Sequence, residues 1–215
     1  MRPLEQVYRS ISERSVVEIE RKRSRFIGIA APVETAAGAE AEIARAEAEF
    51  PRATHYCYAY RAGLESTAVR MSDAGEPQGT AGRPILEVIE RNGLVNVCVV
   101  VVRYFGGTLL GAAGLVRAYS AAAAEAVAKA KVVTYALHAV FEACFDYAGW
   151  PRAERALTAY GATFLDIAYG AGVEVRVAAP YERRAEFEEV VTHLAARNCR
   201  AKPVAERYLP KSPES

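Results

Sequence analysis

The sequence lacks the features that mark zinc sites, disulfide scaffolds and membrane spans. Its four cysteines form no Cys-x-x-Cys pair and its three histidines have no metal-ligand spacing, so we expect no metal, and reduced core thiols rather than the alternative of a disulfide between distant cysteines. The longest apolar run, residues 94–102, is less than half as long as a membrane-spanning helix, which needs about 20 residues. Residues 1–15 contain no apolar segment of the kind that forms a secretory signal. We therefore expect a cytoplasmic protein with no membrane partner.

A large excess of either charge is also absent. Twenty-seven Lys and Arg residues stand against 26 Asp and Glu residues, which leaves a net charge of +1. This balance excludes nucleic-acid binding driven by a strong overall field, although it is compatible with local basic patches. The chain is 52% hydrophobic and 25% charged, which is the composition of a folded protein rather than of a disordered one.

The order of periodic segments predicts an α+β protein of two domains. Residues 1–132 form the first domain, and residues 210–215 form a flexible tail. Residues 133–209 form the second domain, whose patterns follow the order strand, helix, strand, strand, helix, strand of a ferredoxin-like fold. In the first domain we expect one long strand or two short ones at 16–33, further strands at 53–61, 67–71 and 95–103, and helices at 35–50, 84–91 and 115–130.

A glycine-rich loop at residues 72–84 precedes one of these predicted helices. Gly79, Thr80 and Gly82 stand just before the start of the helix, where backbone N–H groups and the helix dipole can bind an anion. Arg83 adds a positive charge at the same place. The loop is therefore a candidate anion site.

The same loop carries two acidic residues, Asp73 and Glu76, which can bind a metal or act as acid and base. A second interpretation is structural: Asp73 accepts hydrogen bonds from turn amides, and a neighbouring arginine holds Glu76. His55 is a third candidate, in a strand two residues before Cys57. Side chains at this spacing in a strand lie about 7 Å apart, too far for direct proton transfer, which favours a structural His55.

A second glycine-rich loop connects a buried strand to a long alanine-rich helix. Gly106 and Gly111 have the spacing of a phosphate-binding P-loop, but Ala112 and Ala113 replace its Lys and Ser/Thr. The dinucleotide-binding spacing Gly-x-Gly-x-x-Gly is absent. ATP hydrolysis and NAD binding are disfavoured, and we expect no cofactor.

Two interpretations of this second loop are open. Gly106 and Gly107 can let the backbone approach a phosphate or a partner, with Arg103 and Arg117 as flanking charges. Alternatively, the glycines allow the helix and the sheet to pack closely.

Two further patterns also have two interpretations each. Tyr56, Tyr58 and Tyr60 share one face of a predicted strand, a face that can stack unpaired bases but more often packs under helices. The basic run at residues 21–25 can contact phosphate, or it can form the solvated edge of a strand.

Residues 23–130 resemble the IMPACT/YigZ family in three ordered motifs and in part of the tyrosine strand. These are Ser72-Asp73-x-Gly75-Glu76-Pro77-x-Gly79-Thr80-Ala81-Gly82-Arg83-Pro84, Val102-Arg103-Tyr104-Phe105-Gly106-Gly107, Leu110-Gly111-x-x-Gly114-Leu115-Val116-Arg117-Ala118-Tyr119 and His55-x-Cys57-x-Ala59-Tyr60. The sequence departs from the family pattern at Ala74, where a second acid is usual, and at Ala112 and Ala113, where Thr and Gly are expected. The missing acid weakens the case for a metal site held by two carboxylates.

The resemblance implies a first domain similar to the second domain of a small-subunit ribosomal protein and to domain IV of elongation factor G. It implies a second domain similar to domain V of that factor. Eukaryotic IMPACT inhibits activation of a stress-responsive translation-factor kinase by competing for its activator protein. A role linked to translation is therefore the expectation, although a fold alone does not specify a function.

We expect the first domain to bind RNA, or a protein of the ribosome or translation machinery. Arg83, Arg103 and Arg117 would supply charge, and the amides of the two glycine loops would supply donors. An adaptor that binds only proteins is a further alternative. The enzymatic alternative is a small hydrolase of a phosphorylated or peptide substrate that uses His55, Asp73 and Glu76.

Overall fold

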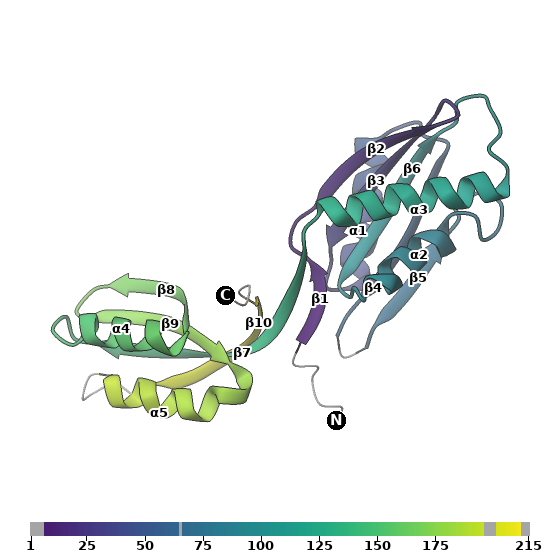
Figure 1. Cartoon of the computed structure of the whole chain (residues 1–215). Helices are drawn as coiled ribbons and strands as arrows, with labels where there is room; N and C mark the ends of the chain where they lie inside the picture. The colour runs from purple at the N-terminus through teal and green to yellow at the C-terminus, as the bar shows by residue number, and fades with distance from the viewer. Residues whose placement is uncertain (1–6, 65, 196–200, 212–215) are drawn as a thin grey trace. The chain divides into compact units, whose positions relative to one another are not determined.

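The computed structural model describes residues 7–64, 66–195 and 201–211, and its chain divides into two compact units, Met1–Thr134 and Tyr135–Ser215 (Figure 1). Both units combine strands and helices, so the predicted α+β class with two domains is confirmed. Within the described residues, no helix has both the length and the apolar character that a membrane span requires.

The first unit is built on an antiparallel five-stranded sheet with helices on both faces. Its strands lie in the order β2-β3-β6-β4-β5, and β6 is the central strand. They are β2 (Ser15–Arg21), β3 (Ser24–Pro32), β4 (His55–Ala62), β5 (Ala68–Ser72) and β6 (Val97–Tyr104). The short strand β1 (Val7–Ile11) precedes them, with a bridge from Arg9 to Leu94.

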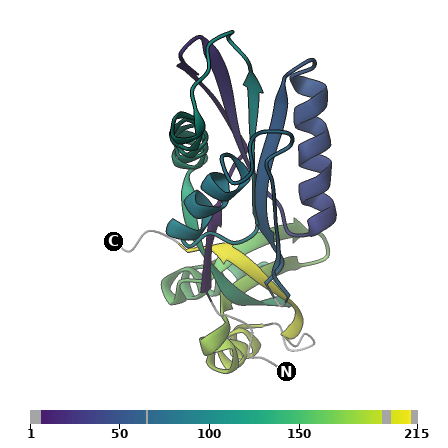
Figure 2. The same ribbon diagram turned by 90° about the vertical axis from the view of Figure 1, so that its right-hand side faces the viewer.

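The helices of the first unit bury the two faces of this sheet in two separate clusters. Helix α1 (Ala36–Glu49) packs on one face, and α2 (Gly82–Arg91) and α3 (Ala112–Lys129) pack on the other (Figure 2). Strand β6 is buried from Val97 to Arg103 because both of its faces are covered, which explains its nearly continuous valine sequence. Of the two arrangements predicted for 16–33, the structure has the two short strands, which pair as the hairpin of β2 and β3.

The tyrosine stripe packs into the α1 side of this core. Tyr60 is buried beside Ala39 and Ala46, and Tyr56 and Tyr58 are partly buried at the same cluster. Packing under a helix is therefore the correct interpretation, and base stacking by this stripe is not.

The second unit follows the predicted order of elements. It consists of β7 (Val132–Phe145), α4 (Trp150–Tyr160), β8 (Thr163–Tyr169), β9 (Val173–Pro180), the 3₁₀ turn η1 (Tyr181–Arg183), α5 (Arg184–Leu194) and β10 (Lys202–Pro210). The strands β10, β7, β9 and β8 pair antiparallel in that order, and β1 also pairs with the long strand β7, which gives a five-stranded sheet. Side chains from α4 and α5, including Trp150, Leu157 and Phe187, join strand residues in one core.

Pro210, the first residue of the predicted tail, ends β10, whereas residues 212–215 lie outside the described part of the chain.

The cysteines match the prediction of reduced thiols only in part. Cys57 and Cys98 are buried free thiols, as predicted. Cys144 is disulfide-bonded, so the prediction of reduced thiols throughout is wrong there. The spacing of cysteines along a sequence does not show which of them meet in the fold. Cys199 lies outside the described residues.

Candidate functional site

The loop at residues 72–84, named here the Asp73 loop, is organised around one carboxylate. Asp73 Oδ2 accepts the Gly79 N–H at 2.8 Å, and Asp73 Oδ1 accepts the N–H groups of Ala81 at 3.0 Å and Gly82 at 2.8 Å. Burial acts to raise the pKa of Asp73, but the three amide donors outweigh it and lower the pKa below its usual value.

Asp73 therefore occupies the amide cradle that the sequence predicts for an external anion. The amides of Gly79 and Gly82 donate to the protein's own carboxylate, and Thr80 is buried, with its hydroxyl donating to the Pro77 carbonyl at 2.7 Å. The prediction of an open anion site at these three residues is wrong, because a closer internal acceptor satisfies the donors. The structural interpretation of Asp73 is the correct one.

Glu76 lies at the centre of a buried cluster beneath this loop. Its Oε1 accepts hydrogen bonds from Arg103 Nη1 at 2.6 Å and from the Tyr119 hydroxyl at 2.7 Å. His55 Nε2 lies 3.8 Å from the same oxygen, and His55 Nδ1 lies 2.9 Å from the Ala74 carbonyl. A neighbouring arginine thus holds Glu76, as the structural interpretation of the loop predicts.

Arg103 is an internal residue rather than a surface charge. Only 5% of it is exposed, and besides Glu76 it contacts Ser24 Oγ at 3.4 Å. Its guanidinium lies over the rings of Phe26 and Phe105, at 5.4 and 5.3 Å from their centroids. The prediction that Arg103 supplies accessible charge is wrong, because a buried guanidinium requires a buried acid and finds it in Glu76.

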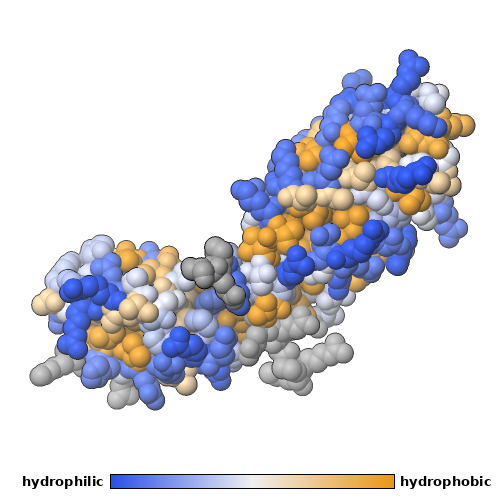
Figure 3. All heavy atoms as spheres, viewed as in Figure 1, coloured by the Kyte–Doolittle hydropathy of each residue, from blue (hydrophilic) through white to orange (hydrophobic). Residues whose placement is uncertain are grey.

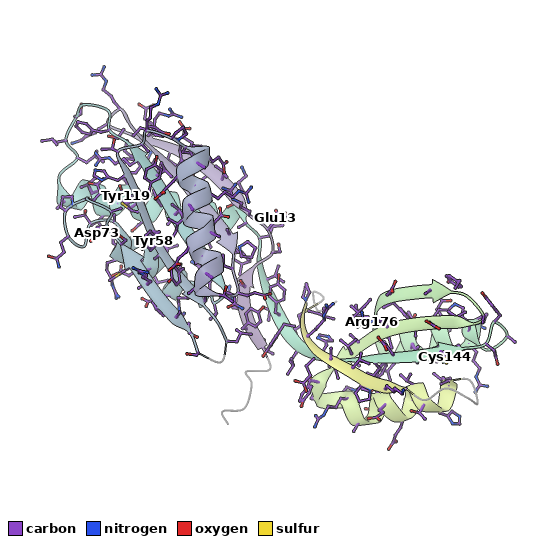
Figure 4. All side chains as sticks on the ribbon, turned by 180° about the vertical axis from the view of Figure 1, so that it is seen from behind. Glu13, Tyr58, Asp73, Tyr119, Cys144 and Arg176 are labelled. Atoms are coloured by element: carbon purple, nitrogen blue, oxygen red, sulfur yellow. The ribbon has the colours of Figure 1, made fainter. Side chains whose placement is uncertain are left out.

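The remaining polar groups of this cluster are poorly suited to nucleophilic catalysis. Burial raises the pKa of the Cys57 thiol to about 12, and burial also raises the pKa of the Tyr119 hydroxyl. The Cys57 thiol donates to the Asp73 carbonyl at 3.0 Å. Figure 4 labels Asp73 and Tyr119 in the same part of the first unit, around this cluster. Among the described residues, no group of three or more His, Cys, Asp and Glu side chains could hold a metal ion.

Arg83 is exposed but already paired on its own helix. It lies 3.1 Å from Glu87 and 3.8 Å from Glu90, on the outer face of α2. Its charge is therefore largely compensated by local acids, and it does not join the other predicted arginines.

Arg117 lines a groove at the start of α3, where the tip of the β2–β3 hairpin meets that helix. The groove has a volume of about 250 Å³ and is lined by Arg21, Lys22, Leu110, Gly114, Arg117 and Ala118, which we name the basic groove. None of the lining residues is acidic, and no ion pair joins its three cationic side chains to any residue that the structure describes. The only hydrogen bond that these three side chains make among the described residues runs from Arg21 Nη1 to the Glu20 carbonyl at 2.8 Å, so positive charge gathers here without a carboxylate partner.

The loop at residues 105–111, named here the β6–α3 loop, lies against the hairpin tip. A Cβ atom added at Gly106 would come within 2.0 Å of the Arg23 carbonyl group, so only glycine permits this approach. Gly107 has a φ of +80° and open space around it. Phe105, Leu109 and Val116 are exposed at this end of the unit. In Figure 3, hydrophobic atoms are interspersed with hydrophilic ones on the face that carries α2 and α3.

The comparisons with known proteins cover both units. Residues 22–127 match the Impact N-terminal domain, and residues 145–196 match a domain of unknown function, DUF1949. The IMPACT family member YvyE of Bacillus subtilis (strain 168) is 33% identical over 205 residues, which are 95% of this chain and 94% of that protein. The chain belongs to the IMPACT family. The resemblance seen in the sequence motifs is thus confirmed.

Two further relatives agree with this membership. The IMPACT family member YigZ of Escherichia coli (strain K12) is 36% identical over 181 residues, covering 80% of this chain and 85% of that protein. A crystal structure of a hypothetical protein is 30% identical and aligns with a TM-score of 0.63, over 94% of this chain and 99% of that one.

In this IMPACT family protein, the fold separates the predicted site residues into two groups. His55, Glu76 and Arg103 meet inside the first unit, Asp73 accepts hydrogen bonds from the amides of its own loop, and Arg117 lies outside at the basic groove. The basic run at 21–25 is visible in the sequence, but its proximity to Arg117 is not. In the structure, Lys22 and Arg23 form a two-residue connection between β2 and β3, a turn that carries neither the glycine nor the asparagine by which a sequence usually signals one.

Proposed function

We propose that this protein acts in translation by binding structured RNA through the basic groove of its first unit. The observation that carries the proposal is the convergence of Arg21, Lys22 and Arg117 on one groove with no acidic lining residue. Phosphate neutralisation by such side chains is the main source of affinity for RNA backbones. Membership of the IMPACT family supports the link to translation, since the family's fold resembles domains of translation factors.

The contrast with other arginines of the first unit supports the assignment to this groove. Arg25 pairs with Glu18 at 2.8 Å, Arg70 pairs with Glu40 at 3.4 Å, and Arg83 pairs with the acids of α2. An arginine that already faces a carboxylate gains less from a phosphate, because it must give up one partner for the other. The cations of the basic groove have no carboxylate partner among the described residues to give up.

Measuring RNA affinity at several salt concentrations tests the proposal. The variant Arg21→Gln/Lys22→Gln/Arg117→Gln should bind a structured ribosomal RNA fragment at least tenfold more weakly in about 0.1 M salt. Its salt slope should fall by about 1 for each RNA phosphate that the variant no longer neutralises. Arg83→Gln is the matched control and should leave both quantities unchanged. Equal affinity and slope for the triple variant and the unmodified protein would contradict the proposal.

The other sequence-based alternatives have less support. A hydrolase that uses His55, Asp73 and Glu76 requires groups free to act on a substrate, whereas all three contact polar groups of the protein itself. If the protein is an adaptor that binds only proteins, its partners should remain bound after nuclease treatment and at high salt.

The strand order of the second unit supports the ferredoxin-like fold that we propose for it from its sequence.

A further inference from the structure

Phe105 is an exposed aromatic ring supported from one side by a buried cation. It directly follows β6, and 46% of it is exposed. Side chains two positions apart in an extended segment share a face, so Phe105 and Arg103 lie on the same side of the sheet. The Arg103 guanidinium lies 5.3 Å from the centre of the Phe105 ring. The ring thus has a supported side within the protein and a side open to solvent.

Neighbouring contacts hold the backbone of Phe105 in place. Its N–H donates to Thr54 Oγ1 at 3.0 Å, and the next N–H, of Gly106, donates to Ser24 Oγ at 3.1 Å. Arg103 is itself held by Glu76, at 2.6 Å, within the buried cluster. The enzymatic alternative takes this buried cluster as catalytic. In the structure, the cluster instead holds Arg103, which supports the exposed ring of Phe105.

The loop that begins with Phe105 contacts the hairpin tip of the basic groove. Gly106 packs on the backbone of Arg23, the residue after Lys22, so the β6–α3 loop and the groove's hairpin tip are in direct contact. A flat ring next to unpaired cations is complementary to a nucleotide, which presents a flat base and an anionic phosphate a short distance apart. An apolar protein segment would match the ring but not the cations.

We propose that Phe105 stacks on an unpaired base of the RNA whose phosphates the basic groove binds. This inference rests on the proposed RNA binding and specifies the class of RNA: a helix with a bulged or looped-out nucleotide rather than a continuous duplex. Arg103 is a positioning residue, since it supports the ring from within and does not reach the RNA. Stacking is tolerant of base identity, so the preference concerns unpaired structure and not sequence.

The test compares two hairpin RNAs that differ only in one bulged adenosine. The unmodified protein should bind the bulged hairpin about 5- to 100-fold more tightly, the range expected for one stacked base. Phe105→Leu should abolish this preference and retain the affinity for the fully paired hairpin, which also shows that the variant is folded. Phe105→Trp should keep the preference. Tyr169→Leu, which removes an exposed aromatic ring of the second unit, is the matched control.

The tryptophan variant adds a direct readout of stacking. The chain contains one Trp residue, Trp150, which is buried in the second unit and provides a constant background. The fluorescence of Phe105→Trp should be quenched by the bulged hairpin and much less by the paired one. Equal quenching by both RNAs contradicts stacking on an unpaired base.

The outcomes separate this inference from the proposed function. If the unmodified protein binds both hairpins equally, and the groove variant loses both, RNA binding stands and the stacking inference is wrong. If Phe105→Leu keeps the preference for the bulge, the inference is wrong and the exposed ring belongs to a protein contact. If neither hairpin nor any ribosomal RNA fragment binds, both proposals fail.

Discussion

At the scale of single residues, the charges in the two glycine loops have opposite roles. Asp73 and Glu76 face inward and take hydrogen bonds from the protein, whereas Arg117 faces a groove without an acid. The physical distinction is desolvation: a buried charge is stable only with a partner, so each inward charge has one. Arg103, paired with Glu76, is therefore structural, whereas Arg117 in α3 is available for binding.

The carboxylate of Asp73 should make stability depend on pH in the acid range. Its native pKa lies below the unfolded value of about 3.9, so the stabilisation is complete above about pH 4 and is lost as the pH falls through the native pKa. Asp73→Asn should reduce the free energy of unfolding at pH 7 by about 1–3 kcal/mol and flatten its decline in acid. Urea unfolding at a series of pH values measures both effects.

Glu47→Gln, a change at an exposed position of α1, is the control and should keep the acid dependence of the unmodified protein. An Asp73→Asn variant with an unchanged pH profile would show that the carboxylate does not organise the loop.

At the scale of elements, the β2–β3 hairpin places two basic residues in an unfavourable backbone conformation. Lys22 and Arg23 have φ values of +48° and +69°, in the left-handed region that glycine and asparagine adopt most readily. Asn-Gly is the pair typical of such a two-residue connection. Charge is thus present at this tip at some cost in backbone strain, which is consistent with a role in binding.

Replacing Lys22-Arg23 by Asn-Gly should therefore change stability and RNA affinity in opposite directions. The free energy of unfolding should rise by about 1–2 kcal/mol because the strain is relieved. Affinity for structured RNA should fall because two cations are removed from the tip. Thermal unfolding and RNA titration of the same preparation measure the two changes.

Lys131→Gly offers a matched comparison. Lys131 also has a positive φ, +56°, and lies just after the C-terminal end of α3. The basic groove lies at the other end of this 18-residue helix, which is about 27 Å long. This variant should gain stability without losing RNA affinity. A loss of affinity in both variants would place the binding surface elsewhere.

At the scale of the whole molecule, the two units have separate cores. Phe187 is fully buried in the second unit, between Phe141 and Tyr160, with ring centroids 5.4 and 5.1 Å away. None of the residues of this core belongs to the two clusters of the first unit. We therefore expect each unit to unfold as a cooperative element of its own.

Phe187→Ala should destabilise the second unit by about 3–5 kcal/mol and leave the first unit unchanged. Trp150 fluorescence follows the second unit, because the only tryptophan lies in that core. Hydrogen exchange of the β6 amides follows the first unit. The unfolding midpoint of the fluorescence signal should fall while β6 protection persists, whereas a joint loss of both signals would mean that the units unfold together.

Much of the fold could be predicted because its signals are local. The helix predicted at 35–50 is α1, which begins after Thr35, whose side chain accepts the Gly38 N–H at 3.1 Å. The helices predicted at 84–91 and 115–130 begin two and three residues earlier in the structure. The sequence left one or two strands open at 16–33, because the hairpin turn found there lacks the glycine or asparagine that usually marks one.

The sequence by itself determined the α+β class, the two domains, most of the elements and the family, since periodicity, caps and ordered motifs involve residues close together in the chain. Only the tertiary structure decided which charges are internal and which are accessible. Glu76 and Arg103 are 27 positions apart, and Arg21 meets Arg117 only because a hairpin tip reaches the start of α3. Pairing across such separations depends on how strands and helices pack, and no local pattern encodes which acid neutralises which arginine.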